Sequence, residues 1–202
     1  MSDYTGSAKF LIAAIVTGCC VAAADADVVC TYSRSFSLRI PAEEPATRGW
    51  MHDAVIDIPS HLIITDVDVS IDVAHSKVFD LQVYLESPSG STVLLNEYDP
   101  DTEYFNGEDY QGTHFDDEAT RSIEQGSAPF AGTYRPLGSL SVFDGQDACG
   151  VWRLSICDAY YMNTGRFTGF TLEITVPEPA TAVLLGLGVS LATFVVRRRS
   201  RV

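Results

Sequence analysis

The centre of the chain alternates between apolar and polar residues, and turn residues separate the alternating stretches. The clearest stretch is residues 66–73. Its apolar positions are Val67, Val69, Ile71 and Val73, and its polar positions are Asp66, Asp68, Ser70 and Asp72. Because successive side chains of a strand point to opposite faces, this pattern predicts a β-strand with one buried and one solvated face.

Similar patterns recur along the rest of the centre. Residues 80–86 alternate and stop at the turn residues 87–90, and residues 92–95 are expected to form the returning strand. Further ordered segments are expected at 131–134, 140–143 and 150–157, with a last strand at 170–176. No window of helical period longer than two turns occurs between them. Short strands separated by turns predict an all-β sandwich or barrel.

Residues 96–130 depart from this pattern. Between residues 96 and 124 there are ten acidic residues, and Arg121 is the one basic residue. We expect a long acidic loop that is broken by a short paired segment near residues 113–115. Long ordered loops in small domains are usually functional or stabilised by an ion.

The N-terminal end is predicted to be a signal peptide, residues 1–26. An apolar stretch of about 15 residues follows Lys9, which is short for a membrane span. Small residues at 22–26 suit a signal peptidase. Two alternatives remain open: residues 16–19 resemble a lipoprotein cleavage box that would place a lipid on Cys19, and the stretch could be an uncleaved anchor.

The C-terminal end is predicted to hold a transmembrane helix at residues 180–196. This stretch carries no charge and precedes Arg197, Arg198 and Arg199. A helix of this length rises about 25 Å, enough for a short span. Arginines stay on the cytoplasmic side of a membrane, so the centre of the chain is expected outside the cytoplasm.

The charge of the centre narrows the choice of partners. Residues 27–176 hold 24 acidic and 8 basic residues, a net charge near −16. Such a surface repels phosphate backbones, which argues against a nucleic-acid partner. It attracts cations, divalent ones especially, although it also serves solubility outside the cell.

The cysteines give no disulfide framework. After signal cleavage Cys30, Cys149 and Cys157 remain, an odd number, so at least one is unpaired or pairs between chains. Cys149 and Cys157 flank one expected strand, which would separate them by about 26 Å, beyond disulfide reach. A bond from Cys30 to either of them stays open.

Several sequence blocks follow one another along the centre of the chain: residues 73–75, 80–91, 115–119, 132–136, 140–143 and 150–154, then Asp158 and Gly165. In this order they resemble the P domain, or Homo B domain, of kexin- and furin-like proprotein convertases and bacterial subtilisin-like proteases. The resemblance implies a jelly-roll-like antiparallel β-sandwich over residues 36–176, with 27–35 as a linker. In convertases this domain supports a neighbouring catalytic domain. The chain offers no stretch long enough for that domain, so we expect no enzyme, and a serine endopeptidase label would be inherited from the family.

In the tail, residues 177–202, Pro177, Glu178 and Pro179 precede the apolar span and the arginine cluster. This order resembles a PEP-CTERM sorting signal. The resemblance implies recognition by an exosortase and processing near Pro177–Pro179. Prolines continue neither a helix nor a central strand, so an extended segment is expected here.

Candidate site residues are few. The resemblance implies that His75 is a structural residue, and Trp152 shares a strand face with Leu154 and Ile156, which is typical of a core. No Gly-x-Ser-x-Gly nucleophile motif occurs. Calcium prefers several carboxylate and carbonyl oxygens, and four carboxylates stand at strand ends or in loops of the resemblance. These are Asp80, Asp116, Asp117 and Asp158. The alternative is that they cap turns and stay solvated.

The leading interpretation is a non-catalytic binding or structural module, exported to the cell envelope or the exopolysaccharide matrix. Its expected partners are signal peptidase, exosortase, and exopolysaccharide or another envelope protein. An accessory P domain that acts in trans on a subtilisin-like serine endopeptidase is the alternative. A hydrolase in its own right is the third.

Overall fold

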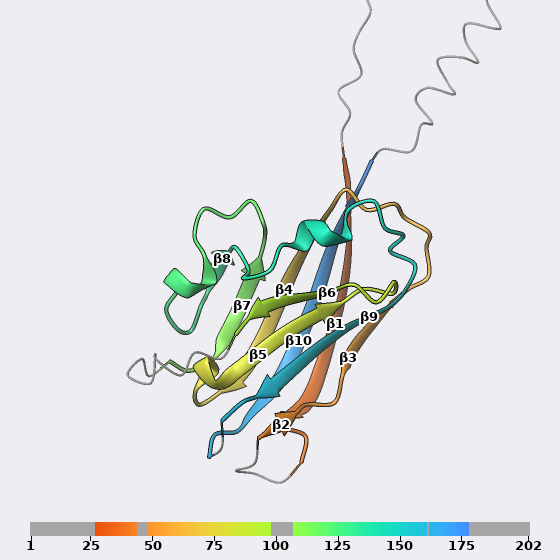
Figure 1. The fold of residues 1–202 in the computed structure, drawn as a ribbon. Coiled ribbons are helices and arrows are strands. Elements are labelled where there is room, and N and C mark those ends of the chain that lie inside the picture. Colours follow the sequence, from red (N-terminus) through yellow and green to blue (C-terminus); the bar gives the residue numbers. More distant parts are fainter. Residues whose placement is uncertain (1–26, 44–47, 98–106, 161, 178–202) are drawn as a thin grey trace, which may run out of the picture.

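The computed structural model describes residues 27–43, 48–97, 107–160 and 162–177, which form two facing β-sheets (Figure 1). The first sheet has the order β1 (Val28–Ile40), β10 (Gly165–Val176), β4 (Asp66–His75), β7 (Tyr110–Phe115) and β8 (Gly132–Tyr134). The second has the order β2 (Gly49–Trp50), β9 (Gly150–Asp158), β5 (Leu81–Glu86) and β6 (Thr92–Asn96), and β3 (Ala54–Ile58) also pairs with β9. The fold is therefore an all-β sandwich. The finer jelly-roll class stays a prediction.

The core lies between the sheets and follows the alternation of the sequence. In β4 the four aliphatic side chains Val67, Val69, Ile71 and Val73 are at most 2% exposed. The inner positions of β5 and β9 are buried in the same way. The predicted strands at 66–73, 80–86, 92–95, 150–157 and 170–176 are confirmed, with shifts of a few residues at their ends. Apolar burial on one face of each strand thus drives the two sheets together.

Short 3-10 helices interrupt the strand pattern of the described residues. Residues 140–143 form a 3-10 helix, η4 (Leu140–Phe143), which buries Leu140 and Phe143. Further 3-10 helices are η1 (Val78–Asp80) and η3 (Ile123–Gln125). The paired segment expected near residues 113–115 is β7.

The expectation of a wholly antiparallel sandwich is wrong at one sheet edge. β8 pairs with β7 in parallel, from Thr113↔Gly132 to Phe115↔Tyr134. Parallel neighbours need a long connection, and residues 116–131 provide one.

The expectation that residues 27–35 are a linker is also wrong, because most of them lie in β1. This strand pairs with β10 from Val28↔Val176 onward. Most of its side chains are exposed or half-buried, so its sequence lacks the strong apolar face of the inner strands. Backbone pairing with β10 makes it a strand.

The first and the last strand of the sandwich bring its two chain ends next to each other. β1 begins and β10 ends side by side at one end of the molecule (Figure 1). The predicted signal peptide, Cys19, the predicted helix 180–196, Glu178, Pro179 and the arginine cluster lie outside the described residues. None of the helices in the described part is both long and apolar enough to cross a membrane. Cys30, Cys149 and Cys157 are free thiols.

Candidate functional site

The outer face of the first sheet carries a group of polar side chains on two paired strands. β4 pairs with β7 through Ser70↔His114 and Val69↔Phe115. One step further, this antiparallel register sets Asp68 opposite Asp116, just beyond the end of β7. Since alternate side chains share a face, these polar residues project from the same side of the sheet.

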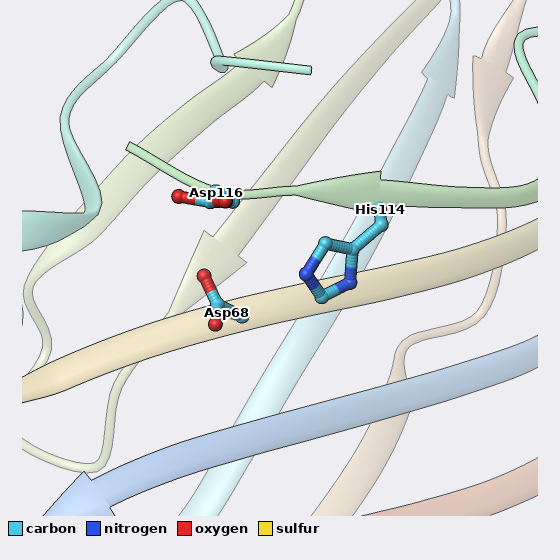
Figure 2. A group of neighbouring side chains, drawn as sticks. All are labelled: Asp68, His114 and Asp116. Carbon is cyan, nitrogen blue, oxygen red and sulfur yellow. The ribbon is translucent and has the colours of Figure 1, made fainter. Parts of the chain in front are cut away.

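Asp68, His114 and Asp116, hereafter the metal-ligand triad, each offer one ligand atom, and these atoms lie within 4.8 Å of one another. In Figure 2 the ring of His114 points one nitrogen toward the two carboxylates. Its Nδ1 atom lies 2.8 Å from the hydroxyl oxygen of Ser70. In the tautomer with the proton on Nδ1, this N–H donates to the hydroxyl oxygen of Ser70, and the lone pair of Nε2 is left for the carboxylate side.

Asp68 is the most perturbed member of the triad. Burial, followed by repulsion from Asp66, Asp116, Glu173 and Glu118, raises the pKa of Asp68 to about 7. Its Oδ1 atom is buried and has no hydrogen-bond partner. Like charges directly opposite on paired strands destabilise a sheet. The triad therefore holds unfavourable negative charge that a proton or a cation would relieve.

The neighbouring Asp117 has a different role. Its Oδ1 atom accepts a hydrogen bond from the backbone N–H of Leu140 at 3.0 Å, and Oδ2 accepts one from that of Ser141 at 3.0 Å. The hydroxyl of Ser139 also donates to Oδ2, at 2.5 Å. Asp117 therefore holds the start of η4 against the loop that follows β7.

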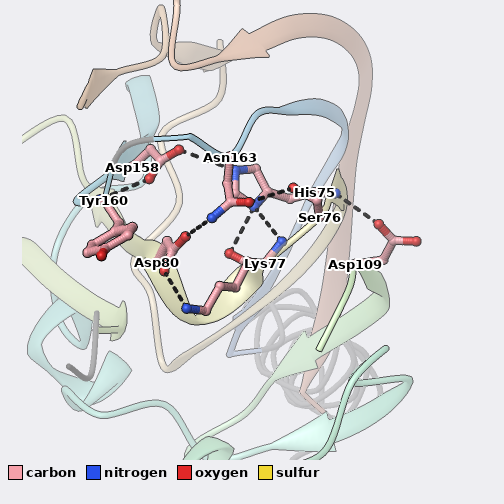
Figure 3. Close-up of polar contacts among 8 residues, drawn as sticks. All are labelled: His75, Ser76, Lys77, Asp80, Asp109, Asp158, Tyr160 and Asn163. Carbon is pink, nitrogen blue, oxygen red and sulfur yellow. Dashed lines mark hydrogen bonds and ion pairs between the residues drawn. The ribbon is translucent and has the colours of Figure 1, made fainter. Parts of the chain in front are cut away.

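A second polar group lies at the opposite end of β4 (Figure 3). His75, Asp80 and Asp158 are 2%, 1% and 0% exposed. The Nε2 atom of His75 faces Oδ2 of Asp158 at 3.4 Å, and its Nδ1 atom lies 2.9 Å from the carbonyl oxygen of Lys77. The amide of Asn163 donates to Asp80 at 2.6 Å. This group joins the ends of β4, η1 and β9.

Burial governs the electrostatics of this second group as well. It raises the pKa of Asp80, while the hydrogen bond from Asn163 and the charge of Lys77 act in the opposite direction. The Nζ atom of Lys77 lies 3.7 Å from Asp80 Oδ1. Removal of one partner of such a buried ion pair destabilises the folded state, because the other charge is left buried and unpaired. The arrangement serves to tie strand ends together, and a substrate has no access to His75.

Comparison with known proteins gives the family. The sequence profile of the proprotein convertase P-domain matches residues 64–174, more than half of the chain. The chain belongs to the proprotein convertase P-domain family. Directly after it, the profile of the PEP-CTERM protein-sorting motif matches residues 175–199. The two families inferred from the sequence are thereby confirmed.

The P domain is also similar to parts of solved structures. A chain in the structure of the complex between an Aeromonas sobria serine protease and a chaperone matches over 75% of this chain and 28% of that chain, with 15% identity and a TM-score of 0.46. The structure of the serine protease of Aeromonas sobria matches over 74% of this chain and 27% of that chain, with 15% identity and a TM-score of 0.43. This chain thus spans less than a third of the proteins it resembles. No curated protein matches it in sequence.

The P domain does not bring the four candidate calcium ligands into one site. Asp116 and Asp117 follow β7, near residue 68 of β4, whereas Asp80 and Asp158 lie beside His75. Seven residue steps along β4, from residue 68 to residue 75, separate these two places by about 23 Å. The four carboxylates therefore form two separate pairs, and calcium binding by either pair stays a prediction.

Asp68 and His114 are the members of the triad that sequence reasoning missed. The alternation of residues 66–73 predicts Asp68 on the solvated face of its strand, and nothing in the sequence pattern gives His114 a role. The available signal was the His-x-Asp spacing of 114 and 116 on a short paired segment. Such spacing places two ligand atoms on one face of a strand.

The remaining aromatic candidates divide into buried and exposed groups. Trp152 is fully buried, donates from Nε1 to the carbonyl of Ala148 at 3.0 Å and packs edge-on against Phe143. The ring of Tyr160 lies under the ammonium group of Lys77. Trp50, in contrast, is 52% exposed.

Proposed function

We propose that this protein is an exported, non-catalytic binding or structural module that the PEP-CTERM tail sorts to the cell envelope or the exopolysaccharide matrix. The observation that carries the proposal is the order of the two families. The P-domain match ends at residue 174 and the sorting motif begins at residue 175. The folded domain is thus joined directly to its sorting signal.

Processing at both ends is part of this proposal. Signal peptidase would remove residues 1–26, and the span 180–196 would hold the protein in the membrane until an exosortase processes it. The start of β1 and the end of β10 support this view, because they pair at Val28↔Val176. Both cuts would then fall just outside the sandwich and leave its hydrogen bonds intact.

An aromatic pair of the exposed Trp50 and the half-buried Tyr84 supports a polysaccharide as the ligand. Trp50 and Tyr84 lie on the outer face of the second sheet with ring centroids 5.7 Å apart. Beside them Arg153 pairs with Asp53 at 2.9 Å, and Asp53 also accepts a hydrogen bond from Ser155 at 2.9 Å. Sugars present apolar C–H faces and many hydroxyls, which suit aromatic rings with a polar border.

The position of this pair fits a protein held at its tail. Trp50 pairs with Cys157 at the end of β9 that also carries the Asp158–His75 contact. His75 pairs with Gly165 at the start of β10, so this end lies opposite the end where β10 leads into the tail. The aromatic pair would face away from the membrane.

The test combines localisation with binding. Deletion of residues 177–202 should move the protein from the envelope fraction to the periplasm, as followed by immunoblotting. Trp50→Ala should weaken co-sedimentation with exopolysaccharide purified from the producing strain. Val151→Ala, an exposed apolar change on the same sheet, is the matched control and should bind normally.

If the protein is instead an accessory P domain that acts in trans on a protease, a different experimental result is expected. If the protein acts on a subtilisin-like protease, that protease should co-purify with it after crosslinking on intact cells. Co-purification of the protease together with no binding of the parent protein to the exopolysaccharide would replace the proposed function with the accessory role.

A further inference from the structure

Three side chains of metal-binding type converge on the outer face of the first sheet. Asp68 comes from β4, and His114 and Asp116 come from β7 and the residue after it. Their ligand atoms lie within 4.8 Å of one another. Nitrogen and oxygen ligands about 2 Å from a tetrahedral zinc ion stand roughly 3.3 Å apart, so the ligand atoms of the triad would have to approach one another by at most about 1.5 Å to share one ion.

The triad has one acceptor that the protein itself does not satisfy. Oδ1 of Asp68 is buried and accepts no hydrogen bond. A buried acceptor without a partner costs free energy, and native proteins seldom leave one. Asp66, Glu118 and Glu173 add further negative charge around it. None of the ion pairs found among the described residues joins the triad to a lysine or arginine.

The histidine is held in a suitable orientation. Ser70 lies 2.8 Å from Nδ1 of His114 on the paired strand. Histidines that bind metals usually hydrogen-bond through the ring nitrogen that does not face the metal, which fixes the ring. Nδ1 is thus engaged by Ser70, and the nitrogen that points toward Asp68 in Figure 2 is available as a ligand.

We propose that Asp68, His114 and Asp116 form a binding site for a divalent transition-metal ion of the zinc type. Imidazole favours zinc and its neighbours, whereas calcium and magnesium prefer sites made of oxygen alone. Three protein ligands leave a fourth position for water or for a carboxylate of a partner. The site does not depend on the sorting tail or on a polysaccharide ligand.

Calorimetric titration of the full chain, purified in mild detergent and freed of metal with a chelator, tests this assignment. Zinc chloride should bind with one ion per chain at the triad. Asp68→Asn and His114→Gln should each weaken zinc binding by roughly 100-fold or more, and Ser70→Ala by about tenfold. Calcium chloride, titrated in parallel, should bind more weakly than zinc at this site.

Matched variants separate the site from other sources of binding. His61→Gln removes an exposed histidine that contacts Asp147 near Cys149, a pair that could bind zinc adventitiously. Asp57→Asn removes an exposed carboxylate of β3. Both should leave the site intact.

Unfolding of the variants would not explain a loss of binding. Asp68→Asn removes repulsion from the apo domain, so it should fold at least as well as the parent, which circular dichroism checks. No zinc binding, equal binding by the parent and the three triad-region variants, or tighter binding of calcium than of zinc would each overturn the assignment.

Discussion

At the scale of single residues, charge repulsion around Asp68 gives a pH-dependent stability. The pKa of Asp68 is about 7 in the folded domain, against 3.8 for the free side chain. The folded state therefore binds more protons between these values, and the free energy of unfolding falls as pH rises from about 4 to 7. Below this window the penalty is absent, and above it the penalty is fully present.

Asp68→Asn should therefore raise the melting temperature at pH 8 by a few degrees and change it little at pH 4, with a chelator present throughout. The titratable groups that face Asp68 are Asp66 on its own strand, Glu173 on β10, His114 on β7, and Asp116 and Glu118 after β7. Differential scanning calorimetry measures the shift. The exposed Asp57→Asn serves as control, and an equal shift at both pH values would contradict the repulsion.

Gly165 gives a second prediction at this scale, because the backbone packs against His75 there. A Cβ atom at this position would lie 2.3 Å from Cδ2 of His75 and 2.5 Å from the carbonyl oxygen of Ala74. Overpacking of this kind costs about 1–3 kcal/mol, so Gly165→Ala should lower the free energy of unfolding by that amount in urea titrations.

The control for Gly165→Ala is Gly49→Ala. Its added Cβ atom would meet only an ordinary contact, 3.5 Å from Cβ of Pro41. Gly49→Ala should change stability by less than the Gly165 variant. Equal effects of the two substitutions would show that packing against His75 is not the cause.

At the scale of elements, alternation predicts strands well where one face is apolar. β4, β5 and β9 were predictable because burial and solvation alternate along them. β1 was not, since its residues 28–35 are mostly exposed and backbone pairing holds them. The parallel β7–β8 pair and the register that joins Asp68 to His114 depend on contacts distant in sequence, which no local pattern encodes.

A substitution in β1 tests whether residues 28–33 act as a strand or as a linker. Replacement of residues 28–33 by a Gly/Ser sequence of equal length should lower the melting temperature, because β10 would lose well-formed partners from Thr171 to Val176. Hydrogen exchange of the β10 amides should become faster. A linker would tolerate the change without effect on either measurement.

At the scale of the whole molecule, the sandwich has two distinct ends. The triad lies near the end where β10 leads into the tail, since Asp68 pairs with Glu173. The His75 group closes the other end, where β10 begins at Gly165. Because the sandwich has these two separate ends, the four carboxylates predicted to bind one calcium ion lie in two different places. Sequence order brings Asp116 and Asp117 close to each other but says nothing about their distance from Asp158.

The pairing of the two chain ends gives the last prediction, which concerns processing. β1 begins at Val28 and β10 ends at Val176, and these residues are partners in the sheet. Cuts near residue 26 and near Pro177–Pro179 would remove both apolar ends and leave every strand complete. Mass spectrometry of the protein from the medium should therefore give one species with both termini at these places. A lipid mass on Cys19 would mean lipoprotein processing, and a retained C-terminal span would mean that the tail is an anchor. Either result would leave the described strands complete, because all of them lie between residues 28 and 176.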